Sequence, residues 1–112
     1  MTDNSSDGYG GGVYAAGSTI SMAGSRLTGN TATGAGGAVY TSDSSLTLAD
    51  TYVADNSSDG YGGAVYAAGS TISMARSTLT GNAATYAGGA VNTSDSSLTL
   101  ADSRVILNDS DG

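Results

Sequence analysis

Apolar side chains alternate with small polar ones along most of the chain, and this period of two predicts short β-strands. The segments 20–22 (Ile-Ser-Met) and 46–48 (Leu-Thr-Leu) show the alternation. No segment has the three- and four-residue spacing of apolar positions that an amphipathic helix needs. Within residues 31–56 we expect three strands, at about 37–40, 45–48 and 51–54, joined by turns rich in Gly, Ser and Asp.

The whole pattern repeats every 26 residues. Segments 5–30, 31–56, 57–82 and 83–108 align without a gap, and each of them ends in Asn. The first and third segments are identical at 23 of 26 positions and the second and fourth at 19 of 26, so two types of unit, A and B, alternate. A unit of this length with three strands corresponds to one coil of a β-solenoid. We therefore expect one all-β domain over residues 1–112, a parallel β-solenoid of about four coils.

In such a solenoid, equivalent residues of successive coils stack about 4.8 Å apart. We predict four inward columns, all aliphatic or Met: Val13/Val39/Val65/Val91, Ile20/Leu46/Ile72/Leu98, Met22/Leu48/Met74/Leu100 and Leu27/Val53/Leu79/Val105. Leu, Ile and Val number 16 of 112 residues and Phe is absent, a composition that by itself favours disorder. Stacking makes a continuous core from these few residues, so the repeat outweighs the composition.

Two further positions are kept in every coil. Asn30, Asn56, Asn82 and Asn108 form a polar column, and we expect these amides to hydrogen bond along the axis as a structural ladder. A Gly-Gly pair, such as Gly36-Gly37, supplies a positive φ and room for close backbone approach. A phosphate-binding loop is excluded for these glycines, because no helix is predicted after them and the chain contains no Lys.

Outward columns are the candidates for function. Tyr14, Tyr40 and Tyr66 share one column, and their stacked rings either stiffen the ladder or form a binding stripe for a protein or glycan. A second face carries two hydroxyl columns: Thr19/Ser45/Thr71/Ser97 and Ser21/Thr47/Ser73/Thr99. This face resembles the ice-binding faces of β-solenoid antifreeze proteins, although half of its positions are Ser. Ordinary cross-strand pairing of Ser and Thr explains the same pattern.

The composition excludes several other classes of function. His, Cys, Lys and Glu are all absent, so no disulfide, thiolate or imidazole chemistry is available, and we expect no enzyme and no cofactor. The net charge of −7 argues against nucleic acid as a partner. No apolar run approaches the ~18 residues of a membrane span, and the chain shows no signal peptide. We expect no metal site, because the nonapeptide pattern of calcium-binding β-rolls is missing.

The motifs resemble a known family. The sequence Gly-Gly-Ala-Val occurs at 36–39, 62–65 and 88–91, and Leu-Thr-Gly-Asn occurs at 79–82. These are similar to the paired GGA(I/L/V) and FxxN motifs of chlamydial polymorphic outer-membrane protein repeats and related autotransporter adhesin passengers. Here the Phe of the second motif is Leu27, Val53, Leu79 or Val105.

The resemblance implies a right-handed parallel β-helix at the bacterial surface that acts in adhesion. It therefore predicts a non-enzymatic structural or adhesive repeat module of a surface or secreted passenger, either a piece of a longer protein or an engineered module built from one. The expected partners are a host-surface protein or glycan. Because both ends of a solenoid leave unpaired strand edges, we also expect copies of the chain to stack end to end.

Overall fold

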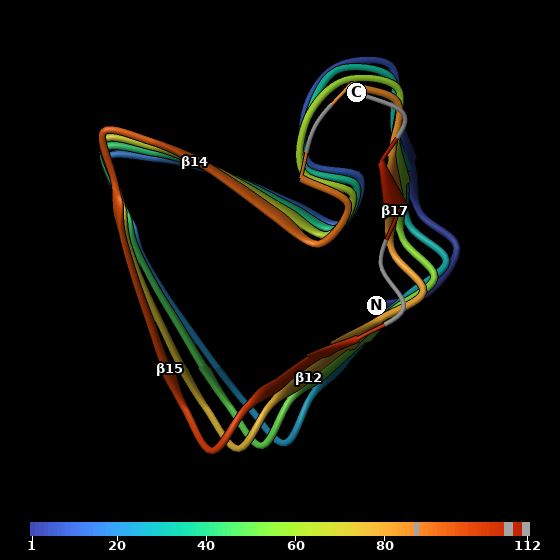
Figure 1. Ribbon diagram of the computed structural model, residues 1–112. Helices are drawn as coiled ribbons and strands as arrows, with labels where there is room; N and C mark the ends of the chain where they lie inside the picture. Colours follow the sequence, from blue (N-terminus) through green and yellow to red (C-terminus); the bar gives the residue numbers. More distant parts are fainter. Residues whose placement is uncertain (87, 107–108, 111–112) are drawn as a thin grey trace.

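The computed structural model describes residues 1–86, 88–106 and 109–110, and they form a parallel β-solenoid (Figure 1). Within this described part the regular structure is all β, with no helix. Seen in Figure 1, the chain runs counter-clockwise while the coils advance from blue toward the red coil in front, so the solenoid is right-handed. This hand is the one expected for crossovers between parallel strands. The predicted fold class is confirmed.

The strands stack into four parallel sheets that run along the solenoid axis. The first sheet contains β2 (Val13–Ala16), β6 (Val39–Ser42), β10 (Val65–Ala68) and β14 (Val91–Ser94). The second contains β3 (Thr19–Ala23), β7 (Ser45–Ala49), β11 (Thr71–Ala75) and β15 (Ser97–Ala101). The third contains β4 (Arg26–Thr28), β8 (Tyr52–Ala54), β12 (Thr78–Thr80) and β16 (Arg104–Ile106). The fourth contains β1 (Ser5–Ser6), β5 (Thr31–Ala32), β9 (Ser57–Ser58), β13 (Ala83–Ala84) and β17 (Asp109–Ser110).

Every pairing has the same register of 26 residues, as in Val39 with Val13 and Val65. Two details of the prediction were wrong. A coil has four strands and not three. The strands of the fourth sheet were missed because, with two residues each, they are too short to show an alternation. The first predicted strand also begins two residues later, at Val39. Gly36 turns the chain there with a φ of 69°, and Gly37 passes so close to the next coil that a Cβ would overlap the carbonyl oxygen of Gly63.

The four predicted apolar columns point into the solenoid, and their middle members are fully buried. Alanines such as Ala38, Ala64 and Ala67 complete the core, a contribution that the count of Leu, Ile and Val did not include. The last coil differs: Leu98, Leu100 and Val105 are exposed, because no described coil covers them. The core therefore lies mainly between the second and third coils.

The Asn column forms a continuous buried ladder. The Asn56 side-chain oxygen accepts hydrogen bonds from both the backbone N–H and the side-chain amide of Asn30, each at 2.9 Å. Asn82 accepts the same pair from Asn56, and the Asn56 amide also donates to the carbonyl of Leu27 at 3.0 Å. Asn108, the last predicted member, lies outside the described residues.

Two ladders of hydroxyl groups form hydrogen bonds to the backbone at other corners of the coil. The sequence did not predict these ladders. The hydroxyl of Ser70 accepts from the backbone N–H of Ser44 at 3.1 Å and donates to the carbonyl of Ala68 at 2.9 Å. The hydroxyl of Ser77 accepts from the N–H of Thr51 in the same way. Each corner thus satisfies its backbone polar groups with a side chain from the next coil.

The corners also explain why Gly and Asp alternate. Gly17, Asp43, Gly69 and Asp95 share one corner column, and all have φ between 49° and 60°. Gly adopts this conformation freely, and Asp is among the residues that tolerate it. The Asp43 carboxylate lies over Gly69 of the next coil, where a Cβ would meet its oxygen. Alternation therefore keeps carboxylates two coils apart.

Replacing Asn56 with Ala tests the ladder. The change leaves the backbone N–H of Asn30 buried without a partner and removes one of the hydrogen bonds to the carbonyl of Leu27, and an unpaired buried group costs about 1–3 kcal/mol. We expect the free energy of unfolding to fall by about 1–3 kcal/mol, measured by denaturant titration. The matched control is Asn4→Ala, at an exposed ladder position in the terminal segment. Equal losses in the two variants would contradict a special role for the buried ladder.

Candidate functional site

Tyr14, Tyr40 and Tyr66 form one aromatic stack on the outside of the first sheet. Each is the second residue of its strand, so it points outward while the preceding Val points inward. The ring centroids of Tyr14 and Tyr40 are 5.1 Å apart and those of Tyr40 and Tyr66 are 5.2 Å apart, with interplanar angles of 6° and 10°. The strand spacing sets these distances. The structure thus brings the three predicted stripe residues together.

Three more tyrosines meet this stack from the neighbouring loops, and the sequence analysis did not join them to it. The ring of Tyr9 lies 4.7 Å from that of Tyr40, and the ring of Tyr61 lies 6.3 Å from that of Tyr66. Tyr86 lies 5.6 Å from Tyr61. The columns of Tyr9 and Tyr86 are visible in the sequence, but their proximity to the Tyr40 column depends on an indentation in the coil's cross-section (Figure 1).

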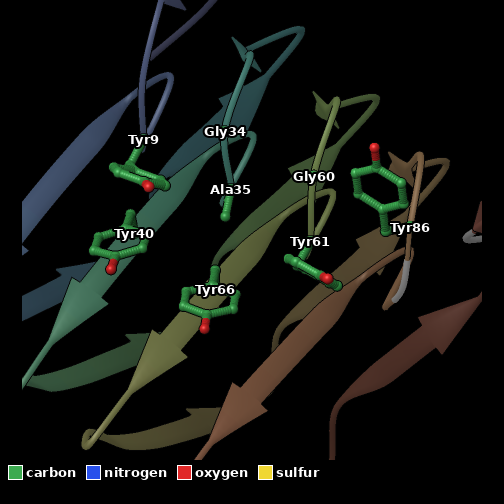
Figure 2. Close-up of a pocket in the computed structure, with 8 residues that line it drawn as sticks. All are labelled: Tyr9, Gly34, Ala35, Tyr40, Gly60, Tyr61, Tyr66 and Tyr86. Atoms are coloured by element: carbon green, nitrogen blue, oxygen red, sulfur yellow. The ribbon is translucent and has the colours of Figure 1, made fainter.

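Five of these rings, all except that of Tyr14, line a groove of about 290 Å³. The lining residues are uncharged: Tyr9, Gly34, Ala35, Tyr40, Gly60, Tyr61, Tyr66 and Tyr86. Figure 2 shows Ala35 between Tyr9 and Tyr61, with Tyr40 and Tyr66 on the other side of the groove. Aromatic walls with a small, open floor are typical of binding sites rather than of plain structural ladders.

The groove changes the acidity of one phenol. Partial burial raises the pKa of Tyr40 above its usual value of 10.0. The neighbouring phenols of Tyr14, Tyr66 and Tyr9 raise this pKa further, because their ionised forms would repel a Tyr40 phenolate. The Tyr40 phenol is therefore uncharged at physiological pH.

The Ser/Thr face is also assembled, on the outside of the second sheet. Thr19, Ser45, Thr71 and Ser97 pair in one column, and Ser21, Thr47, Ser73 and Thr99 pair in the next. All eight are exposed or half-exposed. Thr and Ser alternate out of phase in the two columns, so Thr methyl groups occupy half of the positions in a checkerboard. Cross-strand pairing accounts for this arrangement, and ice binding stays a prediction.

Charged groups lie at the corners instead of in the groove. The Arg76 guanidinium donates to both Asp50 carboxylate oxygens, at 2.8 and 3.1 Å, in a solvent-exposed pair. The hydrogen bond from Arg76 lowers the pKa of Asp50, and the same bond raises the pKa of Arg76. The part of the chain that the structure describes contains no group of three or more Asp side chains close enough to hold a metal ion. Nor do these residues include a helix long and apolar enough to cross a membrane.

The fold and the groove define a β-solenoid repeat protein whose outward side chains are available for binding. Two segments, residues 24–42 and 50–68, match the family model of the Chlamydia polymorphic membrane protein repeat. Each segment runs from one coil into the next, through a ladder Asn, a Gly-Gly pair and a strand of the first sheet. This confirms the resemblance that the Gly-Gly-Ala-Val and Asn motifs indicated. No match was found among curated proteins or among solved structures.

Alkaline titration of the phenols tests the geometry of the stack. Because the pKa of Tyr40 is raised, we expect its phenol to ionise only above pH 10, as followed by the absorbance of phenolate. A raised pKa of an acid means that the folded state holds this proton more tightly. Its contribution to stability is therefore constant below pH 10 and declines as the pH rises further.

Two comparisons complete this titration. Tyr40→Ser is expected to remove this step, and denaturant is expected to return the pKa of Tyr40 toward 10.0. If the pKa of Tyr40 is the same with and without denaturant, the stacked arrangement is contradicted.

Proposed function

We propose that the chain is a non-enzymatic adhesive module of a bacterial surface protein, and that the tyrosine groove is its contact surface. The observation that carries the proposal is a cluster of six tyrosines, five of which line one uncharged groove while Tyr14 stacks on Tyr40. Tyr9, Tyr14 and Tyr86 each expose more than half of their surface, at 51%, 57% and 58%. Contiguous exposed aromatic surface on a soluble fold is characteristic of interaction sites.

Tyr suits adhesion for physical reasons. Its ring buries a large area, its hydroxyl group stays compatible with water, and its two rotatable bonds lose little entropy on binding. In this solenoid, stacking already fixes the rings of Tyr14, Tyr40 and Tyr66 before any partner arrives. A preorganised surface of this kind spends little of its binding free energy on ordering.

The adhesion test uses beads that carry the chain. We expect them to bind host epithelial cells, and the triple variant Tyr14→Ser, Tyr40→Ser, Tyr66→Ser to reduce retention at least about tenfold, as loss of a central aromatic cluster does. The matched control is Tyr52→Ser, which removes a tyrosine that lies outside the groove lining. Circular dichroism verifies that each variant is folded. A folded triple variant that adheres as well as the original chain would refute the proposal.

We also propose that copies of the chain stack end to end. Leu98, Leu100 and Val105 expose 40%, 46% and 43% of their surface on the last described coil. At the opposite end, the half-buried Ile20 and Met22 belong to the same two columns as Leu98 and Leu100.

A second copy fits this face because the units alternate. If the last B coil of one copy covers the first A coil of another, Leu98 meets Ile20 and Leu100 meets Met22. These contacts repeat those between the second and third coils, where Leu46 pairs with Ile72 and Leu48 with Met74. Residues 1–4 already pair with β4 through Thr2 and Thr28, and β17 already pairs with β13 where β1 of the second copy would lie. Both segments must therefore be displaced, and the association is weak.

Sedimentation over a range of concentrations tests the stacking. We expect larger species at high protein concentration, and more of them at high salt, because salt screens the repulsion between chains of charge −7. Leu100→Asp should abolish them by placing a charge on the apolar end face, whereas Thr99→Asp, on the outer face of the same strand, should not. Identical behaviour of these two variants would contradict stacking through the core columns.

A further inference from the structure

The groove contains a slot where one ring of a regular column is missing. Tyr9, Ala35 and Tyr61 are equivalent residues of three successive coils. The N–H of Gly10 donates to the carbonyl of Ala35 at 3.0 Å, and the N–H of Gly36 donates to the carbonyl of Tyr61 at 2.9 Å. These bonds place Tyr9 and Tyr61 two strand spacings apart, or about 9.6 Å. Ala35 fills its place in the column with only a methyl group (Figure 2).

Glycines beside the slot let the Tyr9 ring and the neighbouring backbone approach closely. A Cβ at Gly34 would run into the ring of Tyr9, and a Cβ at Gly60 would overlap the carbonyl oxygen of Gly34. Tyr40 and Tyr66 close the slot across the groove. The result is a space bounded by aromatic rings, with the width of a single inserted ring.

The spacing sets the thickness of the occupant. A ring halfway between Tyr9 and Tyr61 lies about 4.8 Å from each, close to the 5.1 and 5.2 Å of the stacked tyrosines nearby. The face of an aromatic ring carries partial negative charge, and aliphatic C–H groups carry partial positive charge. A pyranose ring with C–H groups on both faces therefore packs favourably against both walls.

Charge and hydrogen bonding further restrict the chemical class of the ligand. The slot is uncharged and the chain has a net charge of −7, which disfavours an acidic sugar. Within the described residues, the hydroxyl groups of Tyr9 and Tyr61, two of the rings that line the slot, have no protein partner. Sugar hydroxyl groups can pair with such donors, whereas an apolar aromatic side chain from a protein would leave them unsatisfied.

We infer that the slot over Ala35 binds a neutral pyranose unit of a glycan, held between Tyr9 and Tyr61. This inference rests on the proposed adhesive function and names the ligand class of the same groove. One sugar between two rings gives an affinity on the order of millimolar. Useful adhesion then requires several such contacts on a multivalent surface.

The test fills the slot without removing a tyrosine. Ala35→Tyr adds the missing ring to the column, a residue that both neighbouring A coils already accept at this position. The matched control, Ala23→Tyr, makes the same change at an exposed position on the second sheet. Tyr61→Ser is a second variant that removes one wall in case Ala35→Tyr does not fold.

The probe is methyl β-galactopyranoside, titrated to about 100 mM, well above the expected millimolar dissociation constant, with the tyrosine ring signals followed by NMR. We expect shifts at Tyr9 and Tyr61 and saturation transfer to the sugar C–H protons. Both should weaken at least tenfold in Ala35→Tyr or Tyr61→Ser and persist in Ala23→Tyr. N-acetyltyrosinamide is titrated in parallel as the mimic of a protein side chain.

Two results would overturn the inference. If only N-acetyltyrosinamide gives shifts that Ala35→Tyr removes, the slot accepts an aromatic side chain of a protein. If neither probe gives shifts that depend on residue 35 or 61, the slot is not a ring-binding site. Cell adhesion distinguishes failure of the sugar-binding inference from failure of the proposed adhesive function. If Ala35→Tyr adheres normally and the triple tyrosine variant does not, only the sugar-binding inference is refuted. The adhesive function alone fails when both adhere normally and the sugar still binds.

Discussion

The structure depends on the constraint that each residue lies on its equivalent 26 residues away. In a parallel stack of short strands, the strand interiors pair through the backbone, but the corners leave polar groups that only a neighbouring coil can reach. The amide ladder through Asn30, Asn56 and Asn82 satisfies one corner, and the hydroxyl groups of Ser70 and Ser77 satisfy two others. A coil therefore supplies the hydrogen-bond partners of the previous coil and needs the next one for its own.

Strict stacking creates a second requirement, because identical bulky or charged residues would lie on one another. The alternation of A and B coils meets it: Gly69 gives space to the Asp43 carboxylate, and Arg76 gives the Asp50 carboxylate an opposite charge. Ala35 separates Tyr9 from Tyr61 in the same way. The slot in the tyrosine groove is thus a consequence of the alternation that makes the corners possible.

The sequence predicts features that depend on the period and misses those that depend on the angle between strands. The apolar columns follow from the 26-residue repeat alone, since Leu46 and Ile72 must coincide once the register is known. The approach of Tyr9 to Tyr40 could not be derived this way, because it needs the directions that corners with positive φ give to each strand. Strands of two residues, such as Thr31–Ala32, are too short for any pattern of alternation.

Features set by the 26-residue period and features set by the angles between strands contribute differently to binding in a repeat module of this kind. The ladders and the core use nearly every inward position, so a substitution there is felt by both neighbouring coils. Outward positions on the same strands do not contact the core or the ladders. Asn92 takes the place of Tyr14, Tyr40 and Tyr66 in the fourth coil, and β14 still keeps its register with β10. Rings placed on a rigid, regularly spaced frame lose little entropy on binding, and the frame places equivalent sites at fixed multiples of the strand spacing. Weak contacts of one ring with one sugar or side chain can then add along the axis, which suits a surface that holds its partner by many contacts.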